Sequence, residues 1–394
     1  MTEQRYRDFS AEWHGRMVRQ RVAADATIEV TRRCPQHCVH CYNNLPAGDA
    51  QAARGELTLE EHCRILDEMA EAGCLWLMYT GGEPFLRSDF LDIYTYAKKK
   101  GFLITLFTSG TLITPEIADY LAEWRPFSIE VTIYGRTRET YERVTGVAGS
   151  YERCLRGIHL LAERRLPLKL KTMVFSLNRH ELGGMKQFAR ELGADFRFDA
   201  MLNPRIDCSR GPLAVRLQPR EIVQLDLDDG QRVSEWKEFA TRFCGLPATP
   251  EQSEQVYSCG GGVMGFAIDP EGRMSVCVLS RFATYDLRRG SFREGWDYLT
   301  REVRRTKITR PTKCTDCGIK ALCGMCPANA ELESGDPEAP VDFLCRVAHL
   351  RAGAMGIPVR AHGACRYCTG VEEYGQQAVG VREAEEAEEA VREA

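Results

Sequence analysis

The stretch Ala26–Tyr42, which reads ATIEVTRRCPQHCVHCY, decides the fold class. It begins with a short apolar run, typical of a strand, and continues into Cys34, Cys38 and Cys41 at CxxxCxxC spacing. Three thiolates so close in sequence can converge on one metal centre, but they are one ligand short of closing a tetrahedral site. A [4Fe–4S] cluster held by three cysteines keeps one iron open for a further ligand. The spacing therefore predicts an open iron–sulfur cluster directly after a strand.

Zinc is the alternative occupant of this loop. His37 or His40 could add a fourth ligand to the three thiols, and structural zinc normally takes four. In either case the loop follows the C-terminal end of a predicted strand, which is where βα-barrel enzymes place their chemistry.

Short apolar runs alternate with helical patterns from Ala24 to Pro204. The runs that predict strands are Ala26–Val30, Leu75–Thr80, Phe102–Thr108, Phe127–Tyr134, Leu168–Ser176 and Asp195–Met201. The helical patterns are a segment that starts at a Thr58–Glu61 capping box, then Asp89–Lys99, Pro115–Trp124, Tyr151–Arg164 and Glu181–Leu192. Serial βα units imply a parallel sheet. We predict an α/β fold, a partial (βα)6 barrel of the TIM type, with an open doubly wound sheet as the alternative.

The rest of the chain divides by composition. The predicted regions are an N-terminal extension (1–23), the βα core (24–205), a helical bridge (206–258), a Cys-rich domain (259–350) and a C-terminal extension with an acidic tail (351–394). Within the Cys-rich region, Gly265–Asp269 and Arg273–Leu279 flank a Pro-Glu-Gly turn and predict a hairpin. Val381–Ala394 is rich in Glu and Ala and is expected to be a solvated helix or a disordered tail.

Composition limits the class of protein. The 394 residues are 44% hydrophobic and 27% charged, which excludes a disordered chain, and the net charge of -4 gives no electrostatic reason to bind nucleic acid or an anionic membrane. The N-terminal sequence lacks the apolar region of a signal peptide, and no stretch approaches the length of a transmembrane segment. We therefore expect a cytoplasmic protein whose 17 cysteines stay reduced and serve as metal ligands or catalytic groups.

The CxxxCxxC loop after the first strand resembles that of the radical S-adenosylmethionine (radical SAM) superfamily. The resemblance implies that Cys34, Cys38 and Cys41 hold a [4Fe–4S] cluster with S-adenosylmethionine (AdoMet) on the open iron. The family usually has an aromatic residue before the last cysteine, where this chain has His40. That difference leaves the number of ligands unchanged.

A second loop, Thr80-Gly81-Gly82-Glu83-Pro84, follows the second predicted strand. Two glycines let the backbone come close to a ligand, and a carboxylate at a strand end can accept hydrogen bonds from an ammonium group. An ordinary βα turn is the alternative. The resemblance implies that Gly81, Gly82, Glu83 and Pro84 form the AdoMet loop, with Glu83 at the amino group.

Later strand ends carry weaker matches to the same family. Ser109 replaces the usual Asn of a TNGT-type turn, Thr132 aligns with a residue that meets the ribose, and Tyr134 replaces an acid. Thr145 stands where the family usually has Arg, so the resemblance leaves Arg143 to bind the AdoMet carboxylate. Barrel packing for Thr132 and a solvated helix face for Arg143 are the alternatives.

The C-terminal cysteines resemble the SPASM extension, which carries auxiliary Fe–S clusters in a subset of radical SAM enzymes, and the resemblance implies clusters of the [4Fe–4S] type. By that resemblance one closed cluster, auxiliary cluster II, is held by Cys314, Cys317, Cys323 and Cys345. The other, auxiliary cluster I, is held by Cys259, Cys277 and Cys326, with its fourth ligand unassigned. Two zinc sites are the alternative.

The remaining thiols lie outside these patterns. Cys365 and Cys368 could complete the three-cysteine cluster, bind a metal or a protein partner, or form an inert surface pair. The cysteines predicted to be structural or core residues are Cys63, Cys74, Cys154, Cys208 and Cys244.

The resemblance also supplies a reaction. Reductive cleavage of AdoMet gives a 5′-deoxyadenosyl radical that takes a hydrogen atom from a substrate, and SPASM members mostly modify peptides or proteins. We therefore expect a peptide- or protein-modifying maturase, which cross-links, epimerises or oxidises its substrate. A small-molecule enzyme acting on a tetrapyrrole, sugar or cofactor precursor is the alternative, and a non-catalytic electron carrier is a third possibility.

Partners and proton-transfer groups follow from the same expectation. A flavodoxin- or ferredoxin-type reductant would supply the electron. The first 23 residues are too few for a leader-peptide module, so a separate leader-recognition protein is expected. Strand ends offer Asp199, Tyr134 and Arg205 as catalytic candidates, with surface or ion-paired roles as the alternative.

Overall fold

The computed structural model describes residues 6–245, 254–281 and 283–368, which group into two compact units. The first unit comprises residues 1–216 and 259–306, and the second comprises 217–258 and 307–394, in each case as far as they are described. The chain thus enters the second unit, returns to the first and enters the second again. The predicted acidic tail, Val381–Ala394, lies outside the described residues.

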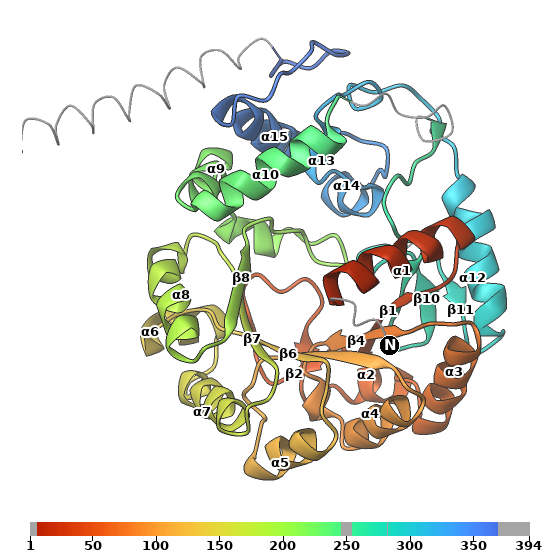
Figure 1. Ribbon diagram of the computed structural model, residues 1–394, viewed down its shortest axis with the longest axis vertical. Helices are drawn as coiled ribbons and strands as arrows, with labels where there is room; N and C mark the ends of the chain where they lie inside the picture. The colour runs from red at the N-terminus through yellow and green to blue at the C-terminus, as the bar shows by residue number, and fades with distance from the viewer. Residues whose placement is uncertain (1–5, 246–253, 282, 369–394) are drawn as a thin grey trace, which may run out of the picture. The chain divides into compact units, whose positions relative to one another are not determined.

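A parallel sheet forms the centre of the first unit (Figure 1). Its parallel strands are β1 (Asp25–Thr31), β4 (Trp76–Gly81), β5 (Leu103–Thr108), β6 (Ser128–Thr132), β7 (Leu168–Met173) and β8 (Asp195–Asp199). Each pairs with the next one along the chain, in the order β1-β4-β5-β6-β7-β8. This order runs in one direction, whereas a doubly wound sheet reverses it at a switch point. The predicted partial barrel is confirmed.

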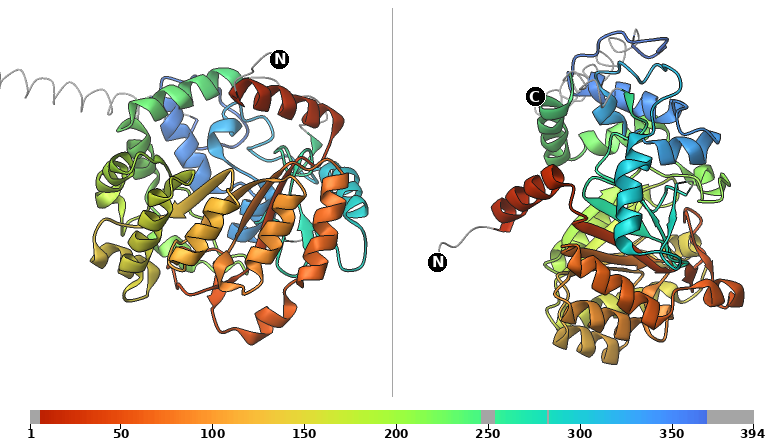
Figure 2. Two further views of the ribbon diagram at one scale, coloured as in Figure 1. Left: turned by 60° about the horizontal axis from the view of Figure 1, so that its bottom comes forward. Right: turned by 90° about the vertical axis from the view of Figure 1, so that its right-hand side faces the viewer.

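Helices follow the strands on the outer side of the sheet, as Figures 1 and 2 show for α3, α4 and α5. The predicted helices are α3 (Leu59–Glu71), α4 (Phe90–Lys99), α5 (Pro115–Glu123), α7 (Ser150–Glu163) and α8 (Leu182–Glu191). Those not predicted are α1 (Tyr6–Gln20), α2 (Ala50–Gly55) and α6 (Arg138–Thr145). Short 3-10 turns are η1 (Pro84–Leu86), η2 (Arg179–Glu181) and η3 (Gly211–Val215). The capping box of Thr58 and Glu61 starts α3 as predicted.

The core of the first unit lies between this sheet and its helices. Tyr79, Ile104 and Ile129, on three adjacent strands, are fully buried. The ring of Phe90 on α4 meets that of Tyr79 edge to face at 5.5 Å. By contrast, β8 is an edge strand, and its exposed residues alternate with half-buried ones.

The predicted hairpin extends the same sheet. It consists of β9 (Gly265–Ile268) and β10 (Arg273–Ser275), followed by β11 (Tyr285–Asp286). Strand β9 pairs in parallel with β1, on the edge opposite β4. The sequence predicted a longer second strand in a separate Cys-rich domain, whereas this hairpin belongs to the first unit. After it come α12 (Phe292–Arg301), whose first N–H donates to Glu68 on α3, and η4 (Val303–Arg305).

The second unit is helical. Its helices are α9 (Pro219–Leu227), α10 (Gly230–Phe243), α13 (Lys320–Cys323), α14 (Pro327–Ser334) and α15 (Asp342–Ala354). Asp226, 1% exposed, accepts hydrogen bonds from Arg232 and from Arg351 on α15, at 2.7 Å in each case. The guanidinium of Arg351 also lies 3.8 Å from the Trp236 ring and donates to the Leu322 carbonyl. One buried arginine therefore links four of these helices.

Within the described residues, none of the helices has both the length and the apolar character that a membrane span requires.

Candidate functional site

The loop with Cys34, Cys38 and Cys41 leaves the C-terminal end of β1. At its base, β2 (Arg33–Cys34) pairs with β3 (Leu45–Pro46), and this small parallel ladder closes the loop. Cys34 is buried, while Cys38 and Cys41 are half-buried. The sequence prediction placed these three thiols on one loop at a strand end, and the structure has them there.

Helix α6 holds the backbone of this loop. The last carbonyls of a helix have no partner inside it. Here the carbonyls of Val144 and Thr145 accept hydrogen bonds from the N–H groups of Val39 (3.1 Å) and His37 (2.8 Å). Gly146 ends α6 in the left-handed conformation, directly beside His37. A helix that the sequence did not predict therefore fixes the loop on one side.

Arg205 holds the loop on the other side. Its Nη1 donates to the carbonyl of Cys41 at 3.1 Å and to Oδ1 of Asn44 at 2.8 Å, and its Nη2 donates to the Asn44 carbonyl at 2.8 Å. Burial raises the pKa of Cys41, and the positive charge of Arg205 opposes part of that rise. Arg205, predicted as a catalytic candidate, contacts the cysteine loop and positions its backbone.

The chemistry of the thiols fits a metal cluster. Burial raises the pKa of Cys34 to about 12 and that of Cys38 well above its ordinary value, and each thiolate raises the pKa of its neighbours. Three thiolates can therefore coexist here only beside a strongly positive centre. Within the described residues, their sulfur atoms do not form a group tight enough for a single ion. Thiolates are the ligands that iron–sulfur clusters take, so this donor set fits such a cluster.

The two histidines of the loop do not complete a zinc site among the described residues. His37 is exposed. His40 is buried between aromatic rings, with its centroid 4.6 Å from Phe175 and 4.8 Å from Tyr134. Burial lowers the pKa of His40 to about 3, so the ring is neutral at physiological pH, and its Nδ1 has no hydrogen-bond partner among the described residues. The imidazole fills the position as an aromatic ring would.

Tyr134 reaches the same loop from the end of β6. Its hydroxyl forms a hydrogen bond with the Cys38 thiol. Burial, followed by the charge of Cys38, raises the pKa of Tyr134 well above its ordinary value. The phenol therefore stays protonated and can serve as a hydrogen-bond donor to this sulfur.

The Gly-Gly pair lies against the start of the cysteine loop. The N–H of Gly82 donates to the Thr31 carbonyl at 2.7 Å, and the N–H of Glu83 donates to the Arg33 carbonyl at 3.0 Å. A Cβ on Gly81 would overlap the Thr31 carbonyl oxygen, and one on Gly82 would overlap the carbonyls of Arg32 and Arg33. In the structure the glycines admit the backbone of the cysteine loop, and their predicted approach to a ligand stays a prediction.

Glu83 is fully buried at the end of β4. Its Oε1 accepts a hydrogen bond from the Thr108 hydroxyl at 2.8 Å, and its Oε2 accepts from the N–H and hydroxyl of Ser109. Burial raises the pKa of Glu83, whereas these hydrogen bonds lower it. Ser109 is held in turn by Thr111, 2.8 Å away. The predicted pair Glu83 and Ser109 thus forms one polar group at the strand ends.

The other predicted residues lie at different places. Thr132 is half-buried at the end of β6. Arg143 is exposed on α6 and donates to the Leu177 carbonyl at 3.2 Å. Asp199 is exposed at the end of β8, and its carboxylate accepts from the N–H of Met201. Thr145 contacts the Ser150 hydroxyl inside the fold.

Charged residues beneath the cysteine loop were missed by the sequence analysis. Glu29 on β1 is 2% exposed and accepts hydrogen bonds from Tyr42 and Asn43, at 2.6 Å in each case. Arg33 forms a bidentate ion pair with Glu56, in which Nε donates to Oε1 at 2.8 Å and Nη2 donates to Oε2 at 2.9 Å. A glutamate between Ile28 and Val30 in a predicted strand was the available signal for this network, because a buried carboxylate requires partners.

Arg32 connects the same loop to the hairpin. It donates to Asp269 at 3.1 Å and to Glu271 at 3.2 Å. These acids belong to the turn between β9 and β10. Side chains from the middle of the chain thus support the backbone that carries Cys34.

The second unit gathers the cysteines predicted for auxiliary cluster II. Cys314, Cys317, Cys323 and Cys345 line one pocket, together with Lys313 and Lys320. Like the first three cysteines, they do not form a single-ion group within the described residues. For auxiliary cluster I, Cys259 and Cys277 belong to the first unit and Cys326 to the second, where its sulfur caps α14 through the N–H of Asn329.

The remaining thiols differ in burial. Cys154 and Cys74 are buried, as expected for structural residues. Cys63 and Cys244 are half-buried, and Cys208 is exposed with a positive φ of 65°.

Comparison with known proteins identifies related enzymes. The AdoMet-dependent heme synthase of Methanosarcina barkeri is 28% identical over 330 residues, which cover 78% of this chain and 92% of the relative. The PqqA peptide cyclase of Granulibacter bethesdensis is 32% identical over 166 residues, covering 42% of this chain and 44% of the relative.

A solved structure shares the fold. The crystal structure of SuiB from Streptococcus suis, bound to S-adenosylmethionine, superposes with a TM-score of 0.63 at 14% identity, covering 88% of this chain and 82% of SuiB. The radical SAM superfamily domain itself matches residues 28–189, which include the cysteine loop, the Gly-Gly-Glu loop and α6. The chain thus carries a radical SAM superfamily domain over residues 28–189, and over 78% of its length it is similar to an AdoMet-dependent enzyme.

Proposed function

We propose that Cys34, Cys38 and Cys41 hold a [4Fe–4S] cluster and that the strand ends beside it bind AdoMet. The observation that carries this proposal is the cysteine loop itself. Its backbone is fixed by α6 and Arg205, and its buried thiols require a positive centre to ionise. When bound and reduced, such a cluster would supply the one electron that breaks a C–S bond of AdoMet into methionine and a 5′-deoxyadenosyl radical, which would take a hydrogen atom from the substrate.

The residues around the loop have complementary tasks. Glu83 keeps its carboxylate oriented through Thr108 and Ser109, and we propose that it accepts hydrogen bonds from the AdoMet ammonium group. Gly81, Gly82 and Pro84 set the path of this loop. Thr132 would meet the ribose, and Arg143, on the helix that holds the cysteine loop, would bind the AdoMet carboxylate. Tyr134 donates its hydrogen bond to the Cys38 sulfur.

For auxiliary cluster II we propose Cys314, Cys317, Cys323 and Cys345, because one pocket is lined by all four. Two lysines on that pocket, Lys313 and Lys320, oppose the negative charge of four thiolates. A closed cluster of this kind can relay or accept an electron. Cys259, Cys277 and Cys326 are proposed for auxiliary cluster I on their sequence pattern alone.

The substrate that we propose is a peptide or protein. PqqA peptide cyclase, which this chain matches over 166 residues, is named for a peptide substrate, and SuiB, which shares the fold, has been crystallised with its precursor peptide SuiA. The product would be a cross-linked, epimerised or oxidised residue of a ribosomally made peptide. A flavodoxin- or ferredoxin-type reductant and a separate leader-recognition protein, all in the cytoplasm, complete this proposal.

A second candidate is a tetrapyrrole substrate. The heme synthase of M. barkeri is matched along 92% of its length, so its similarity extends well beyond the AdoMet-binding region. The two candidates differ in what the enzyme must accommodate, a flexible chain or a rigid macrocycle. They can be separated by product analysis.

The first experiment tests the chemistry. Anaerobically reconstituted protein is incubated with AdoMet and dithionite, and 5′-deoxyadenosine is measured. We expect its formation by the wild type and none by the triple Cys34/Cys38/Cys41→Ala variant, which should keep the iron of the C-terminal sites. A wild type that holds all its iron yet forms no 5′-deoxyadenosine would refute the proposal, whereas loss of all iron from the variant would mean that folding had failed.

The second experiment tests the substrate. Short peptides encoded beside the gene and Fe-coproporphyrin III are each incubated with the active enzyme and analysed by mass spectrometry. A loss of hydrogen or a new cross-link in a peptide supports the peptide proposal. Loss of carbon dioxide from the porphyrin side chains, with every peptide unchanged, would replace it by the tetrapyrrole candidate.

A further inference from the structure

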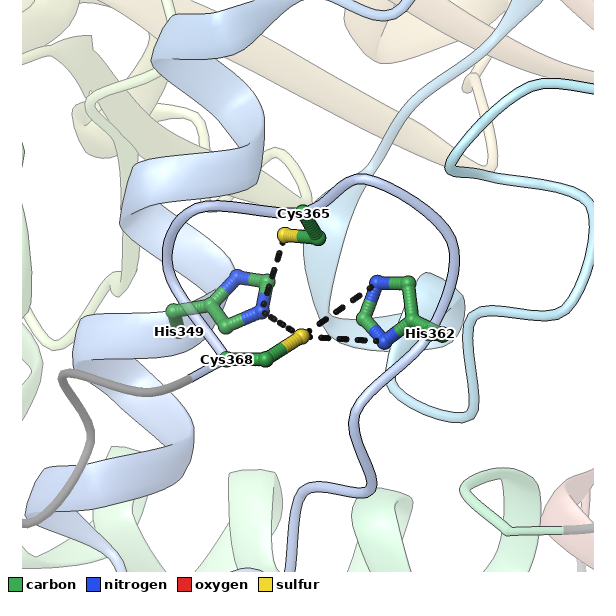
Figure 3. A group of neighbouring side chains, drawn as sticks. All are labelled: His349, His362, Cys365 and Cys368. Carbon is green, nitrogen blue, oxygen red and sulfur yellow. Dashed lines mark hydrogen bonds between the residues drawn. The ribbon is translucent and has the colours of Figure 1, made fainter.

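A second type of metal-ligand group lies at the C-terminal end of the described chain. His349 on α15 faces a tight turn that carries His362, Cys365 and Cys368, and Figure 3 shows the four side chains pointing toward a common centre. Their ligand atoms all lie within 4.8 Å of one another. His349, His362 and Cys365 are buried, and Cys368 is half-buried. The CxxxCxxC loop and the SPASM-like cysteine pattern include none of these residues.

The distances match the edges of a small tetrahedron. His349 Nε2 lies 3.6 Å from the sulfur of Cys365 and 3.6 Å from that of Cys368. The Cys368 sulfur lies 3.9 Å from His362 Nε2 and 3.3 Å from His362 Nδ1. Zinc bonds of about 2.3 Å to sulfur and 2.0–2.1 Å to nitrogen give sulfur–nitrogen edges of about 3.5 Å in a tetrahedral site. The spacing therefore suits a single ion.

Backbone carbonyls orient both imidazoles. His349 Nδ1 lies 2.7 Å from the carbonyl oxygen of Cys345, one helical turn earlier, and His362 Nδ1 lies 3.0 Å from that of Arg360. When each Nδ1–H donates to its carbonyl, each Nε2 is left with a lone pair for a metal. Zinc-binding histidines are commonly fixed by such a contact.

We propose that His349, His362, Cys365 and Cys368 bind one divalent metal ion in a closed tetrahedral site, with zinc as the natural occupant. Two thiolates and two imidazoles form a donor set that structural zinc prefers, and four protein ligands leave no position for substrate. The ion would fasten the turn of residues 362–368 to α15. It is a structural site, and it is independent of the radical chemistry proposed above.

The neighbouring cysteines explain why this group is separate from auxiliary cluster II. The sulfurs of Cys345 and Cys365 are 3.7 Å apart, so the two sites adjoin. Cys345 already has three companions, Cys314, Cys317 and Cys323, around the pocket, and four cysteines close a [4Fe–4S] cluster. Cys365 instead shares its surroundings with His349 Nε2 and Cys368. His349 and His362 also border the pocket, so the ion would stabilise one wall of it.

The test is a metal analysis of the full-length, anaerobically purified protein. We expect about one zinc per chain in the wild type, as a closed four-ligand site requires. His362→Ala and Cys368→Ser should lose most of that zinc and keep the wild-type iron content. Cys244→Ser, which changes a half-buried thiol of the same unit outside the group, should keep both metals. Absence of zinc from wild-type protein grown with ample zinc would overturn the proposal.

X-ray absorption at the zinc edge gives a readout that iron does not obscure. We expect two sulfur ligands at about 2.3 Å and two nitrogen ligands at about 2.0–2.1 Å. If His362→Ala fails to fold, His362→Cys keeps a ligand at that position and should bind zinc with three sulfurs and one nitrogen. A His362→Cys spectrum that still shows two sulfurs, or a variant that loses iron while keeping zinc, would refute the assignment.

Discussion

Glu83 and Ser109 are joined by two hydrogen bonds across the ends of neighbouring strands, from the N–H of Ser109 at 2.8 Å and from its hydroxyl at 2.5 Å, both to Oε2. A buried carboxylate is unstable without such donors. Burial raises the pKa of Glu83, and the donors of Ser109 oppose that rise by favouring the charged carboxylate, at the edge of the sheet where the cysteine loop also lies.

Replacing Glu83 by Gln tests whether that charge binds AdoMet. The amide keeps the shape but loses the charge, so a charge-assisted hydrogen bond to the ammonium group would be lost. We expect AdoMet binding, measured by equilibrium dialysis on the reconstituted protein, to weaken by roughly 10- to 100-fold. Iron content should be unchanged.

Ser109→Ala is the matched control for that substitution. It removes the hydroxyl donor but leaves the carboxylate and the Ser109 backbone contact, so AdoMet affinity should fall by less than about fivefold. Equal affinity in wild type and Glu83→Gln would show that Glu83 has only a structural role in the strand ends.

Gly82→Ala should disrupt the base of the cysteine loop. The new Cβ would lie about 2.6 Å from the Arg32 carbonyl oxygen and even closer to that of Arg33, and backbone atoms cannot move away as a flexible side chain can. We expect a loss of stability of about 3–5 kcal/mol, measured by urea unfolding. Gly48→Ala, where nothing lies within 4 Å of the added Cβ, should change stability by less than about 0.5 kcal/mol. Similar stability of the two variants would contradict the close approach.

Arg205→Ala should make the first cluster labile. The substitution removes three hydrogen bonds, one to the Cys41 carbonyl and two to Asn44, and these acceptors lose the arginine as their donor. We expect roughly tenfold faster iron loss from this site to a chelator, followed optically under anaerobic conditions. Arg289→Ala, which removes an arginine with an 88% exposed side chain from the same unit, serves as the control. Identical rates in both variants would refute the positioning role.

His62 should make the protein sensitive to acid. Burial lowers its pKa to about 3, so the folded protein keeps this ring neutral while the unfolded chain binds a proton below about pH 6.5. Stability from this group is therefore present above pH 6.5 and is lost as the pH falls, by about 1.3 kcal/mol between pH 7.5 and 5.5.

His62→Leu should remove that dependence. The ring is 1% exposed, and within the part of the chain that the structure describes its Nε2 has no hydrogen-bond partner, so an apolar side chain suits the position. Urea unfolding of the wild type and the variant at both pH values isolates the contribution of His62 from that of the other histidines. A difference between the two proteins that does not change with pH would contradict the assignment.

The parts of the fold that local sequence determines were predictable. Apolar runs located the parallel strands, and the Thr58–Glu61 capping box located the start of α3, because both signals lie within a few residues of the structure that they specify. Helix α6 was missed because it is short, and only a few of its residues, such as Tyr141 and Val144, are buried and apolar. Its capping residue Thr137 was the signal that could have shown it.

Features that join distant segments were not predictable in this way. Gly81 and Gly82 signal a close approach, but nothing nearby in the sequence shows that the partner is the backbone of Thr31–Arg33. Likewise, the hairpin was predicted, whereas its pairing with β1 depends on a contact across most of the chain.

The C-terminal metal-ligand group shows the same limit. Cys365 and Cys368 were identified as a pair of possible ligands, since their spacing is local. The two histidines were not, because His349 sits within a helix and has no distinguishing pattern there, and only the folded chain brings it to the turn.

The place of β9 beside β1 has a consequence for how the protein is made. The strand that leads into the cysteine loop acquires its second neighbour only after the ribosome has passed Ile268, and the ion pairs of Arg32 form later still. Until then the backbone N–H and C=O groups along one edge of β1 have no strand to pair with, and such open edges can pair with strands of other chains. A fragment that stops after Asp199 would contain every parallel βα strand and still be prone to aggregate, so the catalytic barrel of this enzyme is not an excisable module.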